Sequence, residues 1–312
     1  MEDINITAKV KNTDFKARLK NLAARVYAAR TGYLFILPLF VFLLTFSYFP
    51  AFSGIFRSLY DWSDTGSKFI GFQNYRELFA DTAVFLPSLV TMLKIMVPKL
   101  LIGIVVPLVA AEMIFNIKSE KMKGAYRLMV LLPIVAPGVV SVLLWEYIYD
   151  PQFGLVTAVW KLFGGQPTAW LDDSATVIPA IIFMGFPWIG GTAVLIYMAG
   201  LSSISQSVRE SAKLDGASVW RIIFSIDLPL ITGQIRYFLI FGLIGGVQDY
   251  SVQFLITDGG PGYDTMVPGY YMYKAAFTSG RMGYACAVGT FLFAVIMVLT
   301  LLSFRISRKE SY

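Results

Sequence analysis

The sequence predicts an all-α, polytopic membrane protein with six transmembrane helices and both termini in the cytoplasm. The 312 residues are 56% apolar and only 15% charged, whereas soluble domains carry about 25% charged residues. The mean hydropathy is +0.64. Apolar segments of about 20 residues, the length needed to cross a bilayer, recur along the chain, and its basic residues are distributed unevenly between the loops. So little charge cannot cover the surface of a soluble domain.

Six segments are predicted to cross the membrane, and they are, in order, Tyr33–Phe56, Phe85–Phe115, Ala125–Tyr147, Ala175–Leu201, Pro229–Ile256 and Tyr284–Phe304. The first follows a charged segment and is too long for a cleaved signal peptide. The second, third and fourth contain internal prolines, at Pro87, Pro98, Pro107, Pro133, Pro137 and Pro187. We expect kinks there, because proline removes a helical hydrogen bond. Pro229 opens the fifth span, where its missing N–H does no harm.

The loops divide into two sets of opposite charge. One side, formed by residues 1–32, 116–127, 202–228 and 305–312, holds 17 basic and 8 acidic groups. The other side, formed by residues 57–84, 148–174 and 257–283, holds 6 basic and 9 acidic groups. Because Lys and Arg are enriched in cytoplasmic loops, the first set and both termini are predicted to be cytoplasmic.

The predicted organisation follows from this topology. It comprises a basic cytoplasmic segment (1–32), a six-helix domain (33–304) with a cytoplasmic loop at 202–229, and a cytoplasmic tail (305–312). The basic segment is expected to set the topology and face lipid. A role in binding nucleic acid is not expected beside six spans.

The composition excludes several chemistries. The chain has no His and a single Cys, Cys286, so it lacks the commonest general base and the commonest metal ligand, and no disulfide can form within it. No G-x-x-x-x-G-K-[ST] phosphate loop is present, and no acids lie at catalytic spacing. We therefore predict neither catalysis nor a metal or cofactor in this chain.

Six charged residues lie within or near the predicted spans, namely Lys94, Lys99, Glu112, Glu146, Arg236 and Asp249. Such groups are costly in lipid and usually face protein or an aqueous path. Lys94, Glu112, Glu146 and Arg236 could instead extend from span ends towards water. Asp249 is harder to explain in this way, because it lies in a polar interruption of the fifth span. It is predicted to line a path or interface, with plain helix packing as the alternative.

The loop from Leu201 to Pro229 has the pattern of two short helices joined by a corner. Ser205 or Ser207 could cap the first helix and Ser218 the second, and Gly216 suits the turn between them. A stripe on the second helix consists of Val219, Ile222, Ile223 and Ile226, at spacings i, i+3, i+4 and i+7. We predict a helix–turn–helix whose apolar face contacts the spans.

This loop resembles the EAA loop of ABC-importer permeases, whose pattern is Glu-Ala-Ala, three residues, Gly, nine residues, Ile, one residue, Leu-Pro. The matching positions are Glu210-Ser211-Ala212, Gly216, Ile226 and Leu228-Pro229. The spacing agrees throughout, and the one departure replaces the middle Ala by Ser211.

Further motifs are similar to the carbohydrate-uptake branch of this family, the maltose-type or UgpA-like permeases. They are Gly32–Pro38, Phe69–Tyr75, Leu131–Pro133, Asp215–Ser218, Thr257–Gly262 and Gly283–Ala285. The chain thus resembles a binding-protein-dependent inner-membrane transport component, which implies the type I ABC-importer permease fold in a bacterial or archaeal cell membrane.

The resemblance implies partners. A second permease subunit would complete the pore, two ABC ATPases would bind ATP and Mg, and an extracytoplasmic solute-binding protein would deliver a sugar or oligosaccharide. ATPase coupling would fall to Glu210, Ser211, Ala212, Asp215 and Gly216. Candidates for the substrate path are Trp188, Gln248, Asp249, Tyr250 and Gln253. Alternatives are an ABC permease for a glycerol phosphate ester or polyamine, a secondary transporter or channel, and a membrane enzyme.

Overall fold

A computed structural model describes residues 25, 27–64 and 66–308, and the chain divides into two units, residues 1–56 and 57–312. Most of the predicted basic segment 1–32, and the last four residues of the tail, lie outside the described residues. In the first unit, α2 (Arg30–Leu43), the π-helical turn η1 (Leu44–Tyr48) and α3 (Phe49–Arg57) form a continuous apolar helix. That helix contains the predicted first span.

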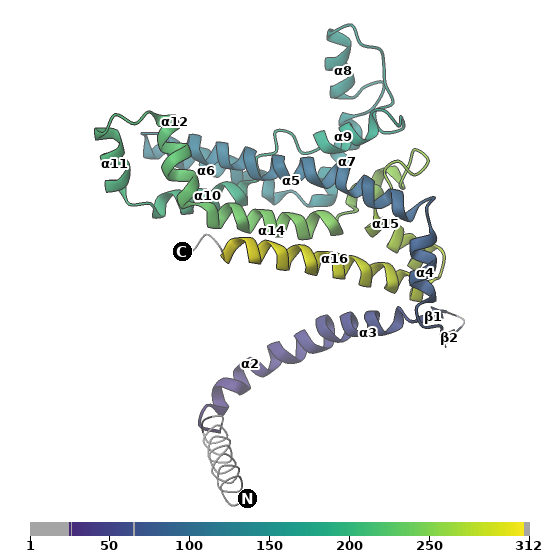
Figure 1. The fold of residues 1–312 in the computed structure, drawn as a ribbon. Coiled ribbons are helices and arrows are strands. Elements are labelled where there is room, and N and C mark those ends of the chain that lie inside the picture. The colour runs from purple at the N-terminus through teal and green to yellow at the C-terminus, as the bar shows by residue number, and fades with distance from the viewer. Residues whose placement is uncertain (1–24, 26, 65, 309–312) are drawn as a thin grey trace, which may run out of the picture. The chain divides into compact units, whose positions relative to one another are not determined.

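The second unit is built around three long helices, α5 (Phe85–Phe115), α14 (Thr232–Gln248) and α16 (Met282–Arg308). α5 packs against α14, and α14 packs against α16, so the three lie side by side (Figure 1). The shorter α10 (Gly191–Ser203) packs along α5. α14 ends at Gln248. After a break at residues 249 and 250, the chain becomes helical again and continues into the π-helical turn η4 (Gln253–Thr257). Buried apolar residues of these helices form the core of the unit.

Four helices of the described chain are long and apolar enough to cross a membrane, and a bent pair could supply a fifth. The bent pair consists of α6 (Glu120–Leu131) with the 3-10 turn η2 (Leu132–Val135), followed by α7 (Gly138–Ile148), and its two arms meet at 89°. The predicted third span is therefore sharply broken. The break falls at Pro137, whose ring prevents the preceding residue from remaining helical.

The predicted fourth span is also not one helix. It is divided into α9 (Val177–Phe183) and α10, with residues 184–190 irregular between them. This stretch contains Pro187, which cannot donate to the helical ladder, and Gly185, whose φ is +94°. The helix that contains the predicted fifth span starts at Thr232 and not at Pro229, because α13 (Leu228–Leu230) is separated from α14 at Ile231.

One end of the second unit carries a small hairpin, which corrects the all-α prediction (Figure 1). Strands β1 (Tyr60–Ser63) and β2 (Gly66–Phe69) pair antiparallel, with Tyr60 opposite Phe69. They precede α4 (Gln73–Ala80), and the Asn74 amide donates hydrogen bonds to the carbonyl oxygens of Ser58 (2.8 Å) and Tyr60 (3.0 Å). α15 (Pro268–Tyr273) and the π-helical turn η5 (Lys274–Thr278) lie at the same end.

Asp81 fixes the start of α5 at the hairpin end. Its carboxylate accepts hydrogen bonds from the backbone N–H groups of Ala83, Val84 and Phe85, and from the Tyr271 hydroxyl at 2.8 Å. Burial raises the pKa of Asp81, but these hydrogen bonds outweigh burial and lower the pKa below its ordinary 3.8. The carboxylate is thus held ionised at the end of a helix whose free N–H groups favour negative charge.

The opposite end of this unit carries the connections that follow α5 and α10. The connection after α10 contains α11 (Gln206–Leu214) and α12 (Val219–Ile222), which continues into the π-helical turn η3 (Ile223–Asp227) and α13. The end of the unit formed by α11 and α12 is called the loop end below. A further short helix, α8 (Leu155–Leu162), lies in the connection between α7 and α9, away from the loop end (Figure 1).

Candidate functional site

The corner between α11 and α12 has the geometry that the sequence predicts. Gly216 has φ +77°. Its N–H donates to the Lys213 carbonyl (3.1 Å), and the Ala217 N–H donates to the Ala212 carbonyl (2.9 Å). This pair of bonds is the Schellman arrangement, which ends a helix with a left-handed residue. The predicted cap at Ser218 is confirmed, since its hydroxyl accepts from the Arg221 N–H at 3.3 Å.

The other end of α11 is capped differently from the prediction. Ser205 occupies the cap position, but its hydroxyl pairs with the Ser207 hydroxyl at 2.7 Å and not with a backbone N–H. The apolar stripe of α12 and η3 is only partly covered: Ile222 is buried, whereas Val219 is 64% exposed. Val219 therefore leaves apolar surface beside the corner.

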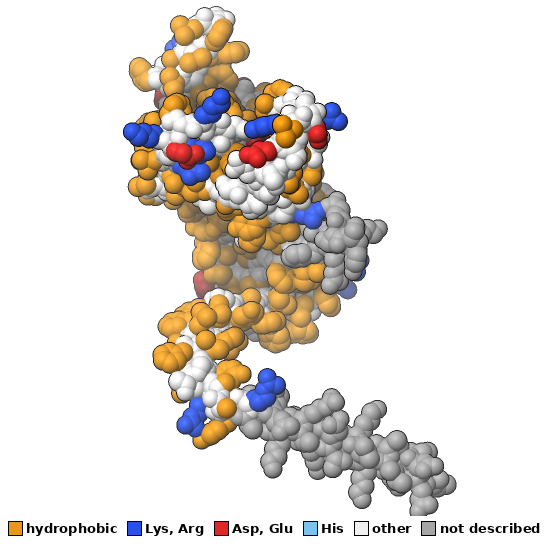
Figure 2. Space-filling view, turned by 90° about the vertical axis from the view of Figure 1, so that its left-hand side faces the viewer, with side chains coloured by type: hydrophobic (Ala, Val, Ile, Leu, Met, Phe, Trp, Pro, Cys, Tyr) orange, Lys and Arg blue, Asp and Glu red, His pale blue; other side chains and the backbone are white. Residues whose placement is uncertain are grey.

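The predicted coupling residues present a mixed polar surface. Glu210, Ser211, Asp215 and Gly216 are exposed and Ala212 is half-buried. The Glu210 carboxylate accepts a hydrogen bond from the Gln206 amide, 2.6 Å away. Figure 2 shows charged side chains of both signs at the loop end, with hydrophobic side chains around them. Such a surface suits a protein partner better than the lipid interior, where unpaired charge is costly.

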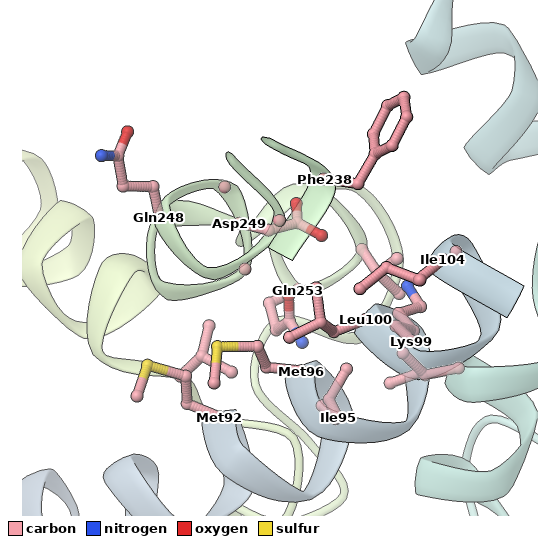
Figure 3. Close-up of a pocket in the computed structure, with 17 residues that line it drawn as sticks. Met92, Ile95, Met96, Lys99, Leu100, Ile104, Phe238, Gln248, Asp249 and Gln253 are labelled. Carbon is pink, nitrogen blue, oxygen red and sulfur yellow. The ribbon is translucent and has the colours of Figure 1, made fainter. Parts of the chain in front are cut away.

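A cavity of about 610 Å³ lies between α5 and α14 (Figure 3). Its α5 wall is apolar apart from one cation. The α5 residues are Met92, Ile95, Met96, Lys99, Leu100, Gly103 and Ile104. The opposite wall comes from α14, η4 and the residues that join them. Its members are Phe238, Gly242, Gly245, Gly246, Gln248, Asp249, Val252 and Gln253. Ile181 of α9 and Val267 complete the lining.

Glycines set how closely the two walls approach. A β-carbon on Gly242 would lie 2.3 Å from Cδ1 of Leu100, and one on Gly246 would lie 2.4 Å from Cγ of Met96. The two helices therefore approach through positions that have no side chain, as membrane helices often do. Gly245 faces open space, so its absent side chain leaves room in the cavity.

The polar groups of the cavity arise where α14 is interrupted. Asp249 ends that helix with extended backbone (ψ 127°), and its Oδ1 accepts from the Ser251 N–H at 3.1 Å. Gln253, four residues on, is only 3% exposed, and its side chain makes no hydrogen bond within the described chain. Lys99 approaches from α5 and interacts electrostatically with Asp249, without an ion pair between the two among the described residues.

The structure thus brings Gln248, Asp249 and Gln253 of the predicted path to one cavity. Gln248 lies on its edge, with its side chain directed away from Asp249 and Gln253 (Figure 3). Because amides and carboxylates bond hydroxyl groups in several directions, the Asp249–Gln253 side of the cavity can hold a polyhydroxylated solute.

Two predicted path residues lie elsewhere. Trp188 falls between α9 and α10, where its ring packs edge-on against Phe183 and Phe186 at centroid distances of 5.4 and 5.1 Å. Its indole N–H is buried without a partner among the described residues. Tyr250 stacks on Tyr270 and Tyr273, at centroid distances of 6.4 and 6.1 Å. Neither residue lines the cavity.

Lys99 is the residue that sequence reasoning did not place in the path. The signal was present, because a lysine in the middle of an apolar helix is costly unless it faces protein or water. It stands 150 positions before Asp249, and only the packing of α5 on α14 brings the two together.

Comparison with known proteins identifies related chains. The family described as "Binding-protein-dependent transport system inner membrane component" matches residues 22–309. The Bacillus subtilis protein named "Probable ABC transporter permease protein YurN" is 32% identical over 277 residues, 88% of this chain and 94% of that protein. The Streptomyces coelicolor "Diacetylchitobiose uptake system permease protein NgcF" is 28% identical, over 87% of this chain and 80% of that protein.

A solved structure has the same architecture. A chain of the "bacterial alginate ABC transporter in complex with alginate pentasaccharide-bound periplasmic protein" superposes with a TM-score of 0.80 and 26% identity. The superposition covers 92% of this chain and 96% of that one.

Proposed function

The chain belongs to the family of inner-membrane components of binding-protein-dependent transport systems, and from this premise we propose that it carries a sugar or oligosaccharide into the cell. It is a multi-pass, non-catalytic permease of an ABC importer, and ATP is bound by partner ATPases. The observation that carries the sugar assignment is similarity over almost the whole chain to permeases named for saccharides, diacetylchitobiose and alginate among them.

The cavity between α5 and α14 is proposed as a segment of the sugar path. Its polar side offers Asp249 and Gln253 to hydroxyl groups, and the opposite wall contains Met92 and Met96, whose flexible side chains can adapt to sugars of different shape. Gln253 supports this assignment, because it lines the cavity and its amide, which makes no hydrogen bond within the described chain, is available to a solute or water. Trp188 and Tyr250, which lie outside the cavity, stay candidates only for contacts made in another conformation.

The charges of the cavity favour a sugar over the two alternative solutes. Its lining contains one cation, Lys99, and one anion, Asp249, within the described chain. A phosphate ester is bound best by several cationic or N–H donors, and a polyamine would require several carboxylates. A lining with one charge of each sign suits a solute that carries hydroxyl groups and little net charge.

The topology proposed is six passes with both termini in the cytoplasm. The bent α6–α7 pair and the interrupted α9–α10 pair would supply the two passes that are not single long helices. Irregular backbone at membrane depth is tolerated where it is buried in protein or lines a cavity. The excess of basic groups on the side of the α11–α12 loop supports a cytoplasmic position for that loop.

The partners proposed are a second permease subunit, two ATPases and an extracytoplasmic binding protein. Glu210, Ser211, Ala212, Asp215 and Gly216 would enter a cleft of one ATPase, so that ATP-driven closure of the ATPase pair moves the spans by alternating access. The exposed corner and the partly uncovered stripe support this assignment. The related alginate transporter was solved in complex with a periplasmic protein, which supports a binding protein here.

Reconstitution tests the function. The tagged chain is isolated from its native membrane, its companions are identified by mass spectrometry, and the complex is reconstituted with the binding protein in proteoliposomes. We expect ATP-dependent accumulation of a radiolabelled sugar. Asp249→Asn and Lys99→Met should change the apparent affinity or rate, whereas Lys94→Met, at an exposed position on the same helix, should not. Isolation without any ATPase, or wild-type behaviour of both cavity variants, would contradict the corresponding part of the proposal.

A further inference from the structure

The α11 helix is fastened to the spans mainly through one side chain, that of Arg209. Its Nε donates a hydrogen bond to Oδ1 of Asp227 at 2.9 Å, and its Nη2 lies 2.7 Å from the same oxygen. The arginine side chain is 13% exposed and the aspartate 3%. The guanidinium carbon also lies 4.3 Å from the centre of the Phe115 ring. Arg209 therefore contacts both η3, the segment that leads into α13 and α14, and Phe115, the last residue of α5.

A second buried acidic residue, Glu112, lies near the Arg209–Asp227 pair. Glu112, one turn before the end of α5, is 6% exposed, and it interacts electrostatically with both Asp227 and Arg209. Its Oε2 accepts only a 3.3 Å hydrogen bond from Asn116, and its Oε1 has no hydrogen-bond partner among the described residues. One cation thus interacts with two buried acidic groups from different segments. Without Arg209, the repulsion between these two buried groups would lose the cation that offsets it.

Other contacts do not duplicate this link. α11 does not pack along any other helix of the described chain. A hollow of about 490 Å³, lined by Arg209 and Asp227, separates it from the ends of α5 and α10. The contact of α11 with Asp227 of η3 and its contact with Phe115 of α5 are both made by the Arg209 guanidinium. With so few neighbours, α11 is connected to the spans by its own backbone and by the side chains that bridge the gap.

We propose that Arg209 is a positioning residue that transmits displacement of the α11–α12 loop to α5 and α14 together. The proposal rests on the function proposed above, in which a partner ATPase moves this loop. Arg209 touches neither nucleotide nor sugar, and its role is to keep the loop and the two cavity helices in one mechanical unit. The planar guanidinium suits this role, because its Nε donates a hydrogen bond to the carboxylate and its Nη2 lies within ion-pair distance, while its face lies on an aromatic ring.

The test compares coupling in the reconstituted complex. Arg209→Met should lower the number of sugars imported per ATP hydrolysed by about fivefold or more, the scale on which sites in one protein are usually coupled. Arg209→Lys keeps the charge but loses the Nε hydrogen bond and the planar contact with Phe115, and should fall between Met and wild type. Arg221→Met is the matched control, because Arg221 is exposed on the neighbouring α12 and its side chain forms no ion pair or hydrogen bond within the described chain. The sugar-to-ATP ratio is unaffected by a variant that merely assembles in lower yield.

A charge exchange and a transport-independent measurement complete the test. The double variant Arg209→Asp with Asp227→Arg should recover part of the ratio, because it restores an ion pair and keeps a cation near Glu112. Hydrogen exchange of the α11 amides should be faster in Arg209→Met than in wild type or Arg221→Met. If the α11 amides exchange faster in Arg209→Met but the wild-type complex transports none of the sugars supplied, the link is supported and the sugar function is overturned. An unchanged ratio and unchanged exchange in a transporting complex would overturn the link alone.

Discussion

A substitution at Gly216 separates two free-energy costs of adding a side chain, the steric clash with neighbouring atoms and the strain of the left-handed backbone. A β-carbon at this position would meet nothing within 4 Å, but the residue has φ +77°. Gly216→Ala therefore introduces no clash, and its whole effect comes from forcing an L-residue into the left-handed region. That cost is about 1–2 kcal/mol, which corresponds to a change of about 5–30-fold in the population of the formed corner.

The chain offers a matched control for this substitution. A β-carbon on Gly233, near the start of α14, would likewise meet nothing within 4 Å, but the backbone at that position is helical. Gly233→Ala should be neutral or stabilising by about 0.5–1 kcal/mol, because glycine is the more costly residue in a helix. The same chemical change is thus expected to have opposite effects at two open positions.

The assay is the affinity of the permease, in lipid nanodiscs, for its ATPase. Gly216→Ala should weaken this affinity by about 5–30-fold, Gly216→Val should weaken it further and abolish uptake, and Gly233→Ala should leave it unchanged. Gly216→Asn should recover much of the loss, since asparagine tolerates the left-handed conformation. Wild-type affinity in Gly216→Ala, or no difference between the Ala and Asn variants, would refute the argument that the corner conformation supports docking.

Three further predictions concern packing and charge within the second unit. Gly246→Ala would place a methyl group 2.4 Å from Cγ of Met96 and should lower the thermal unfolding temperature through about 1–3 kcal/mol of overpacking, whereas Gly245→Ala, facing open space, should not. Gly283→Ala would bring its β-carbon to 2.0 Å from a β1 carbonyl oxygen, which is backbone and cannot rotate away, so limited proteolysis should cut the hairpin faster. Asp81→Asn should lower the unfolding temperature at pH 7. Because the pKa of Asp81 is lowered, its stabilising charge is lost as pH falls through the folded value, and the difference from wild type should shrink below pH 3.8.

The loop was predictable because its determinants are local. A cap residue, a glycine after the last helical turn and an apolar spacing of three and four act within a few residues. The positive φ of Gly216 and the Ser218 cap accordingly agree with the sequence prediction. The Ser205 cap differs only because a nearby hydroxyl, that of Ser207, competes for its oxygen.

The cavity and the broken helices depend on packing between segments that are far apart in the sequence. A local sequence pattern does not predict such packing. Prolines in the third and fourth spans indicated irregularity, but the 89° bend at Pro137 follows from where α7 finds neighbours. Trp188 and Tyr250 looked like sugar-binding aromatics by type, yet each packs against other rings. The β1–β2 hairpin was missed because its strands have only four residues each, too few for an alternating pattern.

The two ends of the proposed mechanism converge on the same pair of helices. Arg209 links the loop to the last residue of α5 and, through Asp227, to the segment that leads into α14, and these two helices wall the cavity. Across that cavity Lys99 and Asp249 attract each other without forming an ion pair in the described chain, so the two polar groups can move apart without breaking an ion pair. The close Arg209–Asp227 ion pair at the loop end, combined with the weaker Lys99–Asp249 attraction across the path, would turn a displacement of α11 into a change in the width of the cavity.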